Sequence, residues 1–401
     1  MRIPYTGPLP LPTIIPKSAN TPTGAAHALV QFLLARDDGH SGVDRSSTLL
    51  LTGAGISVSS GLADYRGTGG TYTLNKTYRP IYYSEFITSH EARKRYWARS
   101  FLGWTNLHRA RPNAAHYAVR TLGSMGILKC VVTQNVDSFH SMAHPDLPTL
   151  ELHGYLRSLI CIHCNTELGR EDFQKDLHTL NPAWASFLER MLTVGALESE
   201  NPEERKAKGL KSNPDGDVDV PNAPYSTFRY PACPSCLEDP PRLVDGSKAL
   251  VEIDKDGAWS PRSTAGVLKP AVVMFGESIA VPVKDAVNQA VDGAARVLVV
   301  GSSLATYSAW RLVKRAKEQR KPIAILNLGG VRGEETFFQH LRANGGGREG
   351  VRCNESASKV LPMVVETLQR TGIYQIERDA PNHGDRTDLT SYEWTPFRTP
   401  S

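Results

Sequence analysis

Four of the six cysteines in the sequence form two Cys-x-x-Cys pairs, Cys161 with Cys164 and Cys233 with Cys236. Thiolates at this spacing are typical of tetrahedral structural zinc, and four filled positions leave none open for catalysis. Prolines interrupt the first residues, so we expect no secretory signal, which favours a metal over disulfides. The long gap between the pairs makes the pattern less specific, and buried free cysteines or a redox pair remain the alternative. We therefore expect a zinc ion that stabilises a small module without doing chemistry.

A glycine turn, Gly53-Ala54-Gly55, directly follows the short apolar segment 47–52. Glycines after a strand let the backbone approach a pyrophosphate, whose charge then lies near the N–H groups that begin the next helix. The alternative is an ordinary turn after a buried strand. Dehydrogenases place an acidic residue about 20 residues further on to bind a ribose, but here Tyr72 and Thr73 occupy that region. An ordinary dehydrogenase site is therefore disfavoured.

Four further polar clusters each come at the end of an apolar segment. Open parallel sheets bind ligands at the carboxyl ends of their strands, so we expect these clusters to meet at one edge. Turn chemistry explains each cluster separately. With the glycine turn at 53–55, however, five strand ends in one chain carry such residues, which favours a ligand site. Among their residues, His153 is suited to general-base work because its ordinary pKa lies near physiological pH, with a structural histidine as the alternative. The clusters are Gln134–Asp137, Glu151–Gly154, Gly301–Leu304 and Asn327–Gly330.

The elements that position these clusters alternate between apolar strands and amphipathic helices. This pattern predicts an α/β fold, a Rossmann-like parallel sheet with helices on both faces, plus a small inserted zinc-binding module. Strands are expected at 47–52, 128–133, 150–153, 271–275, 296–300 and 322–326. We expect the segments 271–275, 296–300 and 322–326 to be strands of the parallel sheet. Helices are expected at 25–36, 113–125, 283–291, 308–319 and 359–369.

Composition divides the chain into four parts. Residues 1–21 are proline-rich and form an irregular leader, which is poor in acidic residues and thus a possible targeting segment. Residues 22–160 and 268–370 form the sheet domain, and 161–267 the loop-rich zinc module, with 237–267 as a surface insertion. Residues 371–401 form a polar tail that we expect to be disordered.

Charge and hydropathy exclude several classes of function. The net charge is +5, yet no run of five Lys or Arg residues occurs, so we expect no direct nucleic-acid binding. No stretch of 18 apolar residues occurs either, so we expect no membrane-spanning helix. The 40% apolar and 22% charged content is typical of a soluble globular protein.

Taken together, these residues resemble the sirtuin (Sir2) family of NAD-dependent protein deacylases, from about Thr48 to Leu361. The order and spacing of the motifs carry the resemblance: Gly53-Ala54-Gly55-Ile56-Ser57, Asp64-Tyr65-Arg66, Pro112-Asn113-Ala114-Ala115-His116, Thr133–Asp137, Leu152-His153-Gly154, the four cysteines, Lys269–Glu277 and Gly301-Ser302-Ser303. Finer features are similar to the mitochondrial class II branch: Arg79-Pro80-Ile81, Arg95–Arg99, Leu180–Trp184, Asp215–Val218, Tyr307-Ser308 and Pro322–Asn327.

The resemblance implies that NAD is consumed as a co-substrate. The carbonyl oxygen of an acyl-lysine would attack the ribose carbon that bears nicotinamide. His153 would then deprotonate a ribose hydroxyl, so that O-acyl-ADP-ribose and free lysine form. His153, Asn135 and Asp137 are the implied catalytic residues, zinc is structural, and Val273, Phe275 and Gly276 would lie along a substrate peptide that adds as a strand. The implied NAD-binding residues are Gly53, Ala54, Gly55, Ser57, Asp64, Tyr65, Arg66, Gln134, Asn135, Asp137, Gly301, Ser302, Ser303, Asn327, Leu328, Gly329 and Cys353.

Other functions remain open at this stage. Protein mono-ADP-ribosyl transfer would use the same NAD site and is the main alternative, ahead of an NAD oxidoreductase or a non-catalytic zinc-bearing interaction module. The branch resemblance suggests long or branched acyl groups, lipoyl-like, with Arg79 or Tyr72 near a polar tail; an exposed Arg79 without a role is equally consistent. It also suggests the mitochondrial matrix, with the nucleus or cytoplasm open because the leader is atypical.

Overall fold

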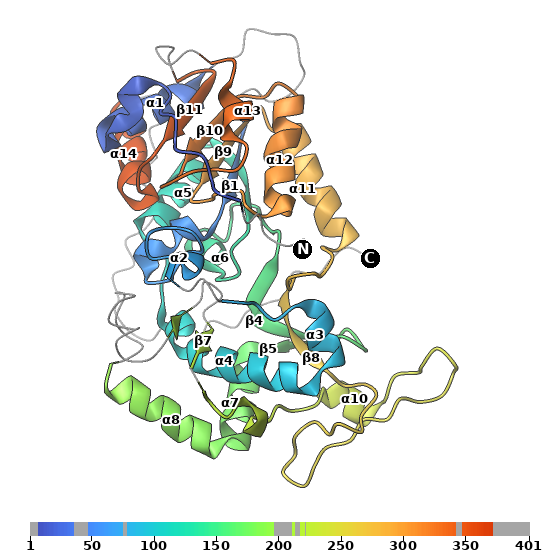
Figure 1. Ribbon diagram of the computed structural model, residues 1–401. Coiled ribbons are helices and arrows are strands. Elements are labelled where there is room, and N and C mark those ends of the chain that lie inside the picture. Colours follow the sequence, from blue (N-terminus) through green and yellow to red (C-terminus); the bar gives the residue numbers. More distant parts are fainter. Residues whose placement is uncertain are drawn as a thin grey trace, which may run out of the picture.

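The computed structural model describes residues 7–35, 47–74, 78–195, 211–212, 217–220, 222–341 and 347–371 (Figure 1). Its larger unit is a six-stranded sheet in the order β11-β10-β9-β1-β2-β3, and every neighbouring pair is parallel. This is the Rossmann order, in which the chain reverses direction across the sheet between β1 and β9. The predicted fold class is confirmed. The strands are β1 (Thr48–Thr52), β2 (Leu128–Thr133), β3 (Thr149–Glu151), β9 (Arg296–Val300), β10 (Ile323–Leu326) and β11 (Gly350–Cys353).

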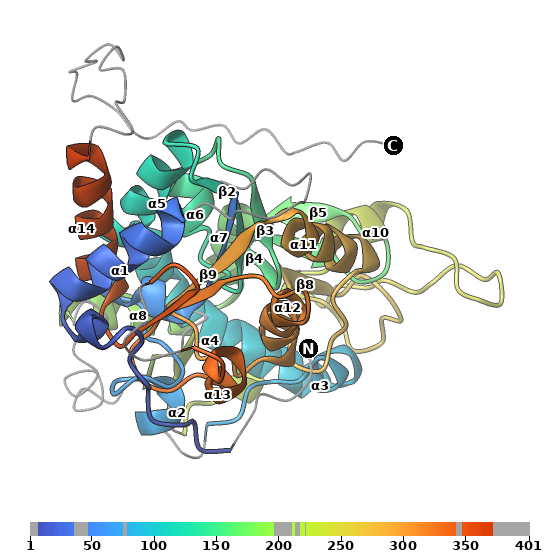
Figure 2. The same cartoon turned by 90° about the horizontal axis from the view of Figure 1, so that it is seen from above.

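Helices cover both faces of this sheet, as Figures 1 and 2 show. Successive strand residues point to opposite faces, so Leu50 packs into one core and Leu49 and Leu51 into the other. The two faces explain why the central strands are apolar throughout. The first face carries α1 (Pro22–Leu34), α5 (Ala114–Ser124) and α14 (Ala357–Arg370), and the second carries α11 (Val281–Gly293), α12 (Tyr307–Glu318) and α13 (Glu334–Phe338).

The smaller unit is built on an antiparallel sheet in the order β5-β4-β8. The expected parallel strand at 271–275 is wrong: the strand is β8 (Leu268–Val272), and it pairs antiparallel with β4 (Gly154–Cys161). Aromatic residues of neighbouring helices pack against β8, and the apolar character of 271–275 did not reveal which sheet the strand joins. The other elements here are β5 (Glu167–Gly169), β6 (Lys211–Ser212), β7 (Val218–Asp219), α3 (Tyr83–Thr88), α4 (His90–Arg109), α7 (Arg170–Leu180), α8 (Pro182–Thr193) and α10 (Pro234–Glu238).

Helices α7 and α8 lie in a stretch that the sequence predicted to be loop-rich. In α7 only Arg170, Phe173 and Leu177 are buried, at the spacing of one helix face, while most of the other positions are charged or polar. The core that they join also takes Trp97 and Phe101 from α4. The small unit thus draws on residues outside 161–267.

The insertion at 237–267 is exposed at its tip and anchored near its end. Val244 is fully exposed, whereas Trp259 is buried. The Trp259 indole N–H donates to the carbonyl of Ala265 at 2.9 Å, and its ring stacks on Tyr230 with centroids 5.8 Å apart.

The chain ahead of α1 packs against the large unit instead of standing free. Ile15 is buried and exchanges two backbone hydrogen bonds with Arg352 of β11, an isolated antiparallel bridge. A short 3₁₀ turn, η1 (Lys17–Asn20), then leads into α1. The predicted disorder of the tail falls on 372–401, outside the described residues.

Candidate active site

The strand ends of β1 and β9 cross backbone to backbone at the point where the sheet order reverses. The Gly55 N–H donates to the Gly301 carbonyl at 2.9 Å. A side chain at Gly55 would place its Cβ 2.8 Å from the Gly301 Cα, and one at Gly301, where φ is +62°, would overlap the Ile56 nitrogen. Only glycine fits both positions. The crossing opens the crevice in which sheets of this kind bind ligands.

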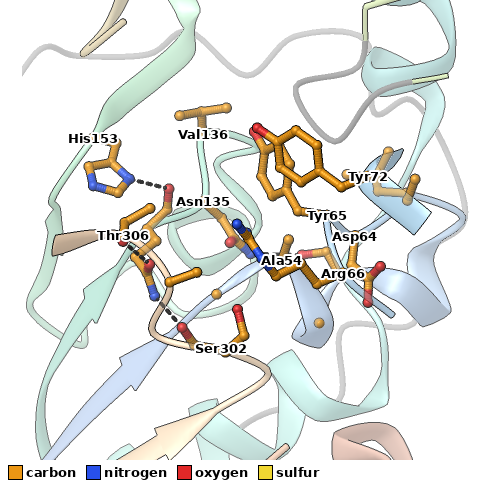
Figure 3. Close-up of a pocket in the computed structure, with 18 of the residues that line it drawn as sticks. Ala54, Asp64, Tyr65, Arg66, Tyr72, Asn135, Val136, His153, Ser302 and Thr306 are labelled. Atoms are coloured by element: carbon orange, nitrogen blue, oxygen red, sulfur yellow. Dashed lines mark hydrogen bonds between the residues drawn. The ribbon is translucent and has the colours of Figure 1, made fainter. Parts of the chain in front are cut away.

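One cavity lies over this crossing, and Figure 3 shows part of its wall. It brings together most of the residues that the sequence singled out for ligand or substrate binding. They are Gly53, Ala54, Gly55, Ser57, Asp64, Tyr65, Arg66, Gln134, Asn135, Asp137, His153, Val273, Phe275, Gly301, Ser302, Ser303, Asn327, Leu328 and Gly329.

Two predicted residues do not line the cavity. The Cys353 side chain is fully buried in the core, and burial raises the pKa of its thiol to about 12. Its carbonyl accepts a hydrogen bond from the Asn327 N–H at 3.2 Å, so it holds a lining residue from behind. Gly276 is exposed at φ +86°, just beyond the lining residue Phe275.

Gln134 connects four segments of the site. Its side-chain amide N–H₂ donates to the Thr52 carbonyl at 3.1 Å and to the Ser302 hydroxyl at 2.7 Å, and its amide oxygen accepts from Thr306 at 2.9 Å (Figure 3). Its backbone carbonyl accepts from the His153 ring. The ends of β1, β2 and β9 and the histidine are therefore fixed relative to one another.

His153 follows β3 and is buried inside the cavity wall. Its Nδ1 lies 3.1 Å from the Gln134 carbonyl oxygen, and its Nε2 lies 2.8 Å from the Ser308 hydroxyl. A carbonyl oxygen only accepts, so Nδ1 carries the proton and Nε2 holds the lone pair. Burial lowers the pKa of His153 to about 4. The ring is thus a neutral base at physiological pH, although its pKa does not lie near 7 as the sequence suggested.

Asp137 and Asn135 are joined through Ser57. The Ser57 hydroxyl donates to Asp137 Oδ2 at 2.7 Å and accepts from the Asn135 amide at 3.1 Å, while the Phe139 N–H donates to Asp137 Oδ1 at 3.0 Å. Burial raises the pKa of Asp137, and the hydrogen bonds from Phe139 and Ser57 oppose this. The carboxyl and the amide are therefore held rigidly in the cavity wall.

The loop after β1 is shaped by Asp64 and by aromatic stacking. Asp64 Oδ1 accepts from the Gly67 N–H at 2.9 Å, and its partly buried carboxyl has a raised pKa because of desolvation. Tyr65 stacks on Tyr72 with centroids 5.7 Å apart, and the Arg66 guanidinium lies 5.0 Å from the Tyr72 ring (Figure 3). Asp64 thus shapes the loop, while Tyr65, Arg66 and Tyr72 face the cavity.

The structure adds cavity residues that the sequence analysis did not single out. Arg99 and Asp217 both line the cavity and form a buried ion pair, with 2.7 Å between Nη2 and Oδ2. Both belong to segments quoted above only as branch markers. Arg79, by contrast, lies outside the lining, is 69% exposed and pairs with Glu85 at 2.7 Å. The structure therefore gives no support to a contact between Arg79 and an acyl tail.

The four cysteines meet in the small unit with their sulfur atoms all within 4.8 Å of one another. Cys161 and Cys236 Sγ are 3.6 Å apart, as are those of Cys164 and Cys233. Sulfurs around tetrahedral zinc lie about 3.8 Å apart, given Zn–S bonds of about 2.3 Å. Burial raises the pKa of the Cys161 and Cys236 thiols. Four thiolates this close also repel one another, so all four ionise together only around a cation. The cluster fits structural zinc.

The comparison with known proteins decides the family, because the Sir2 family model matches residues 53–308. The chain belongs to the Sir2 family, the sirtuins. A relative named NAD-dependent protein deacylase SIR4, from Batrachochytrium dendrobatidis, is 40% identical over 350 residues, covering 86% of this chain and 95% of the relative. The human NAD-dependent protein lipoamidase sirtuin-4, mitochondrial, is 34% identical and covers 79% of this chain, with 81% of its own length matched.

Solved sirtuin structures share the fold. One described as the structural basis for the mechanism and regulation of Sir2 enzymes has a TM-score of 0.51 at 24% identity, covering 87% of this chain and 98% of its own. A Sir2–p53 peptide–NAD⁺ complex has a TM-score of 0.50 at 21% identity, covering 80% and 93%.

The sirtuin is accordingly an NAD-dependent protein lysine deacylase with NAD as co-substrate and acyl-lysine peptides or proteins as substrates. In the part of the chain that the structure describes, no helix is long and apolar enough to cross a membrane.

Proposed function

We propose that His153 is the general base of this deacylase and that the cavity holds NAD and the acyl-lysine on either side of it. The observation that carries the proposal is the state of the His153 ring. Nδ1 donates to the Gln134 carbonyl, so the lone pair lies on Nε2, where it accepts from the Ser308 hydroxyl while no substrate is bound. NAD supplies an activated ribose carbon to which the acyl oxygen bonds as nicotinamide leaves. A ribose hydroxyl then replaces the Ser308 hydroxyl at the lone pair of His153 Nε2, and Nε2 takes its proton.

Asn135 and Asp137 are proposed to line the nicotinamide pocket. Positive charge develops on the ribose as the leaving group departs, and a fixed carboxylate stabilises such charge without reorganising. Ser57 and Phe139 hold Asp137 for this purpose. Ser302, Ser303 and Asn327 are proposed to bind the adenosine half, since they line the cavity at the ends of β9 and β10.

The substrate peptide is proposed to run along Val273–Gly276. The Val273 N–H donates to the carbonyl of His153 at 2.8 Å, so this segment is tied to the base. On its other side, the Phe275 carbonyl accepts from the Tyr83 N–H at 2.8 Å. A peptide adding next to this segment would bring its lysine toward the cavity that Val273 and Phe275 line.

The acyl group is proposed to be long and uncharged, and the Arg99–Asp217 pair supports this choice. Tyr78, Ile81 and Tyr96 line the same cavity and provide apolar surface for a chain longer than acetyl. Asp217 already neutralises Arg99 within the cavity wall. A carboxylate at the end of an acyl chain therefore gains little from Arg99, whereas an octanoyl or lipoyl chain needs no charge partner.

Peptides carrying one lysine acylated with acetyl, octanoyl, lipoyl or glutaryl groups test this proposal. We expect octanoyl and lipoyl peptides to give the highest kcat/KM, with mass spectrometry detecting O-acyl-ADP-ribose. In Asp217→Asn the Arg99 charge loses its partner, so the glutaryl peptide should gain relative to octanoyl. Acetyl or glutaryl as the best wild-type substrate would overturn the acyl assignment. Mass from NAD added to protein, without deacylation, would instead favour ADP-ribosyl transfer.

The mitochondrial matrix is the proposed location. The relative sirtuin-4 proteins from human and cattle are named as mitochondrial, and the first 36 residues contain no Asp or Glu. A fluorescent protein fused to the C-terminus should colocalise with a matrix marker. Signal confined to the nucleus or cytoplasm would contradict this location.

A further inference from the structure

The segment Leu9–Ile15 lies across the loop that follows β10. The Thr13 N–H donates to Glu334 Oε1 at 3.1 Å, and Ile15 pairs with Arg352 through two backbone hydrogen bonds of 3.1 and 2.7 Å. The segment, here called the strap, is thus fixed at two points to the large unit. Its sequence is rich in proline, which limits the conformations open to it.

The two residues that hold the strap also shape the loop 327–331. The Arg352 guanidinium donates to the carbonyls of Asn327 at 3.0 Å and Gly329 at 2.6 Å. Glu334 Oε2 accepts from Arg352 at 3.0 Å and from the Val331 N–H at 2.9 Å. Arg352 and Glu334 are both buried, so this ion pair forms one rigid connection between strap and loop.

The strap also contributes directly to the cavity. Leu9 lines it together with Asn327, Leu328, Gly329 and Gly330. The approach is close, because a Cβ at Gly330 would overlap the Pro10 carbonyl oxygen and lie 2.9 Å from the Leu9 Cβ. Backbone of the strap and backbone of the loop are therefore in contact, and the Leu9 side chain supplies apolar surface at this end.

We propose that the strap is part of the NAD site, with Leu9 as an apolar wall against the adenosine half of the dinucleotide. This inference rests on the proposed placement of that half at Ser302, Ser303 and Asn327. Contact with Leu9 stabilises bound NAD, and the Thr13–Glu334 hydrogen bond keeps Leu9 in place. Any processing of the chain that removes Leu9–Ile15 therefore weakens NAD binding.

Titration calorimetry of the zinc-loaded full chain with NAD and with ADP-ribose tests the strap. Leu9→Ala should weaken the Kd for both ligands about three- to tenfold, as expected for losing part of a buried leucine contact. The matched control is Leu11→Ala, because Leu11 is 90% exposed on the same segment, and its Kd should equal that of the wild type. Leu9→Met keeps an apolar contact and should retain most of the affinity.

Three further measurements separate the possible failures. Inhibition by nicotinamide alone should be the same in Leu9→Ala and wild type, because the strap lies at the adenosine end. Thr13→Pro, which removes the N–H that Glu334 accepts, should reproduce the weaker ADP-ribose binding. If the Kd for ADP-ribose is unchanged in Leu9→Ala but weaker in Asn327→Ala, the strap has no part in NAD binding, whereas the proposed NAD site is supported. An unchanged Kd in Asn327→Ala as well would overturn the placement of NAD on which the strap depends.

Discussion

The hydroxyl of Ser308 lies 2.8 Å from Nε2 of His153, the ring nitrogen that carries the lone pair. Ser308 sits in the first turn of α12, and both residues are buried. In the neutral state the hydroxyl donates to Nε2. When Nε2 gains a proton, the same hydroxyl can rotate and accept from it. The second hydrogen bond involves a charged group and is the stronger of the two, so Ser308 favours protonation of the base.

Replacing Ser308 with alanine should therefore make His153 a weaker base. We expect Ser308→Ala to lower kcat about tenfold, as for a lost hydrogen bond to a charged group, with little change in the KM for NAD. A purely structural role would instead lower stability and affect both constants. Ser308→Thr keeps the hydroxyl and should recover most of kcat. Equal kcat in wild type and Ser308→Ala would show that the contact has no part in proton transfer.

Loss of the base itself gives a larger effect. We expect His153→Ala to reduce deacylation by about two orders of magnitude or more, the span associated with general-base loss. Because burial lowers the pKa of His153 to about 4, this group stays neutral from pH 5 to 8. In the free enzyme its titration should lower kcat/KM only as the pH falls through about 4. Near wild-type turnover in His153→Ala, or an acidic limb near pH 6.5 assigned to His153, would contradict this account.

Three buried histidines behind the site make the fold sensitive to acid. His140 Nδ1 lies 2.8 Å from His144 Nε2, and the His116 and His140 rings lie 5.1 Å apart. Burial lowers all three pKa values, that of His116 to about 3. Neighbouring histidines lower the pKa values of His116 and His140 further, and Arg120 lowers that of His144 further. Below pH 6.5 the unfolded chain binds more protons than the folded one, so the free energy of unfolding decreases as the pH is lowered.

The measurement for this cluster is Tm as a function of pH. Tm should drop steadily from pH 7 to pH 5, and His144→Gln should flatten the curve by removing one of the groups. His178→Gln is the control, because His178 is exposed on α7. A cluster variant with the same slope as the wild type would show that other groups set the acid sensitivity.

The sequence predicted the large unit well because its central strands are buried on both faces, and glycines directly follow β1 and β9. The segments 128–133 and 296–300 match β2 and β9 residue for residue. The hydrophobic pattern failed to predict strands whose pairing or burial depends on a residue or strand elsewhere in the chain. The segment 271–275 is as apolar as a parallel strand, yet β8, which it overlaps, pairs antiparallel with β4. β11 was missed since it carries Arg352, a charge that only the ion pair with Glu334 makes compatible with burial.

The candidate site was predictable where the type of a residue and its position after a strand indicate its role. Gly53 and Gly301 follow strands, and a histidine and an acid at strand ends point to chemistry. Contacts between distant segments were not predictable, because no local pattern indicates them. Ser308 meets His153 across 155 positions in the chain, and Thr13 meets Glu334 across 321. Their discovery required the fold.

Gly301 should tolerate no side chain. Gly301→Ala faces both a left-handed backbone, which costs about 1–2 kcal/mol for other residues, and overlap with the Ile56 nitrogen. We expect a large loss of stability and loss of NAD binding. Gly126→Ala is the matched control, since Gly126 has φ +73° but open space around its Cβ position. Denaturant unfolding should show a clearly larger loss in the free energy of unfolding for Gly301→Ala than for Gly126→Ala. Equal losses would contradict the close backbone contact between Gly301 and the Gly55–Ile56 segment.

Removing zinc should unfold the small unit before the large one. Cys161, Cys233 and Cys236 are part of its hydrophobic core, so the metal and the packing stabilise each other. We expect one zinc per chain by mass spectrometry of metals, and a strong chelator should lower Tm and abolish deacylation, because β4 and β8 join the site to this unit. Cys164→Ser should lose the metal, whereas Cys130→Ser should keep it, since Cys130 lies on β2 outside the cluster. Full zinc content in Cys164→Ser would show that the four cysteines are not its ligands.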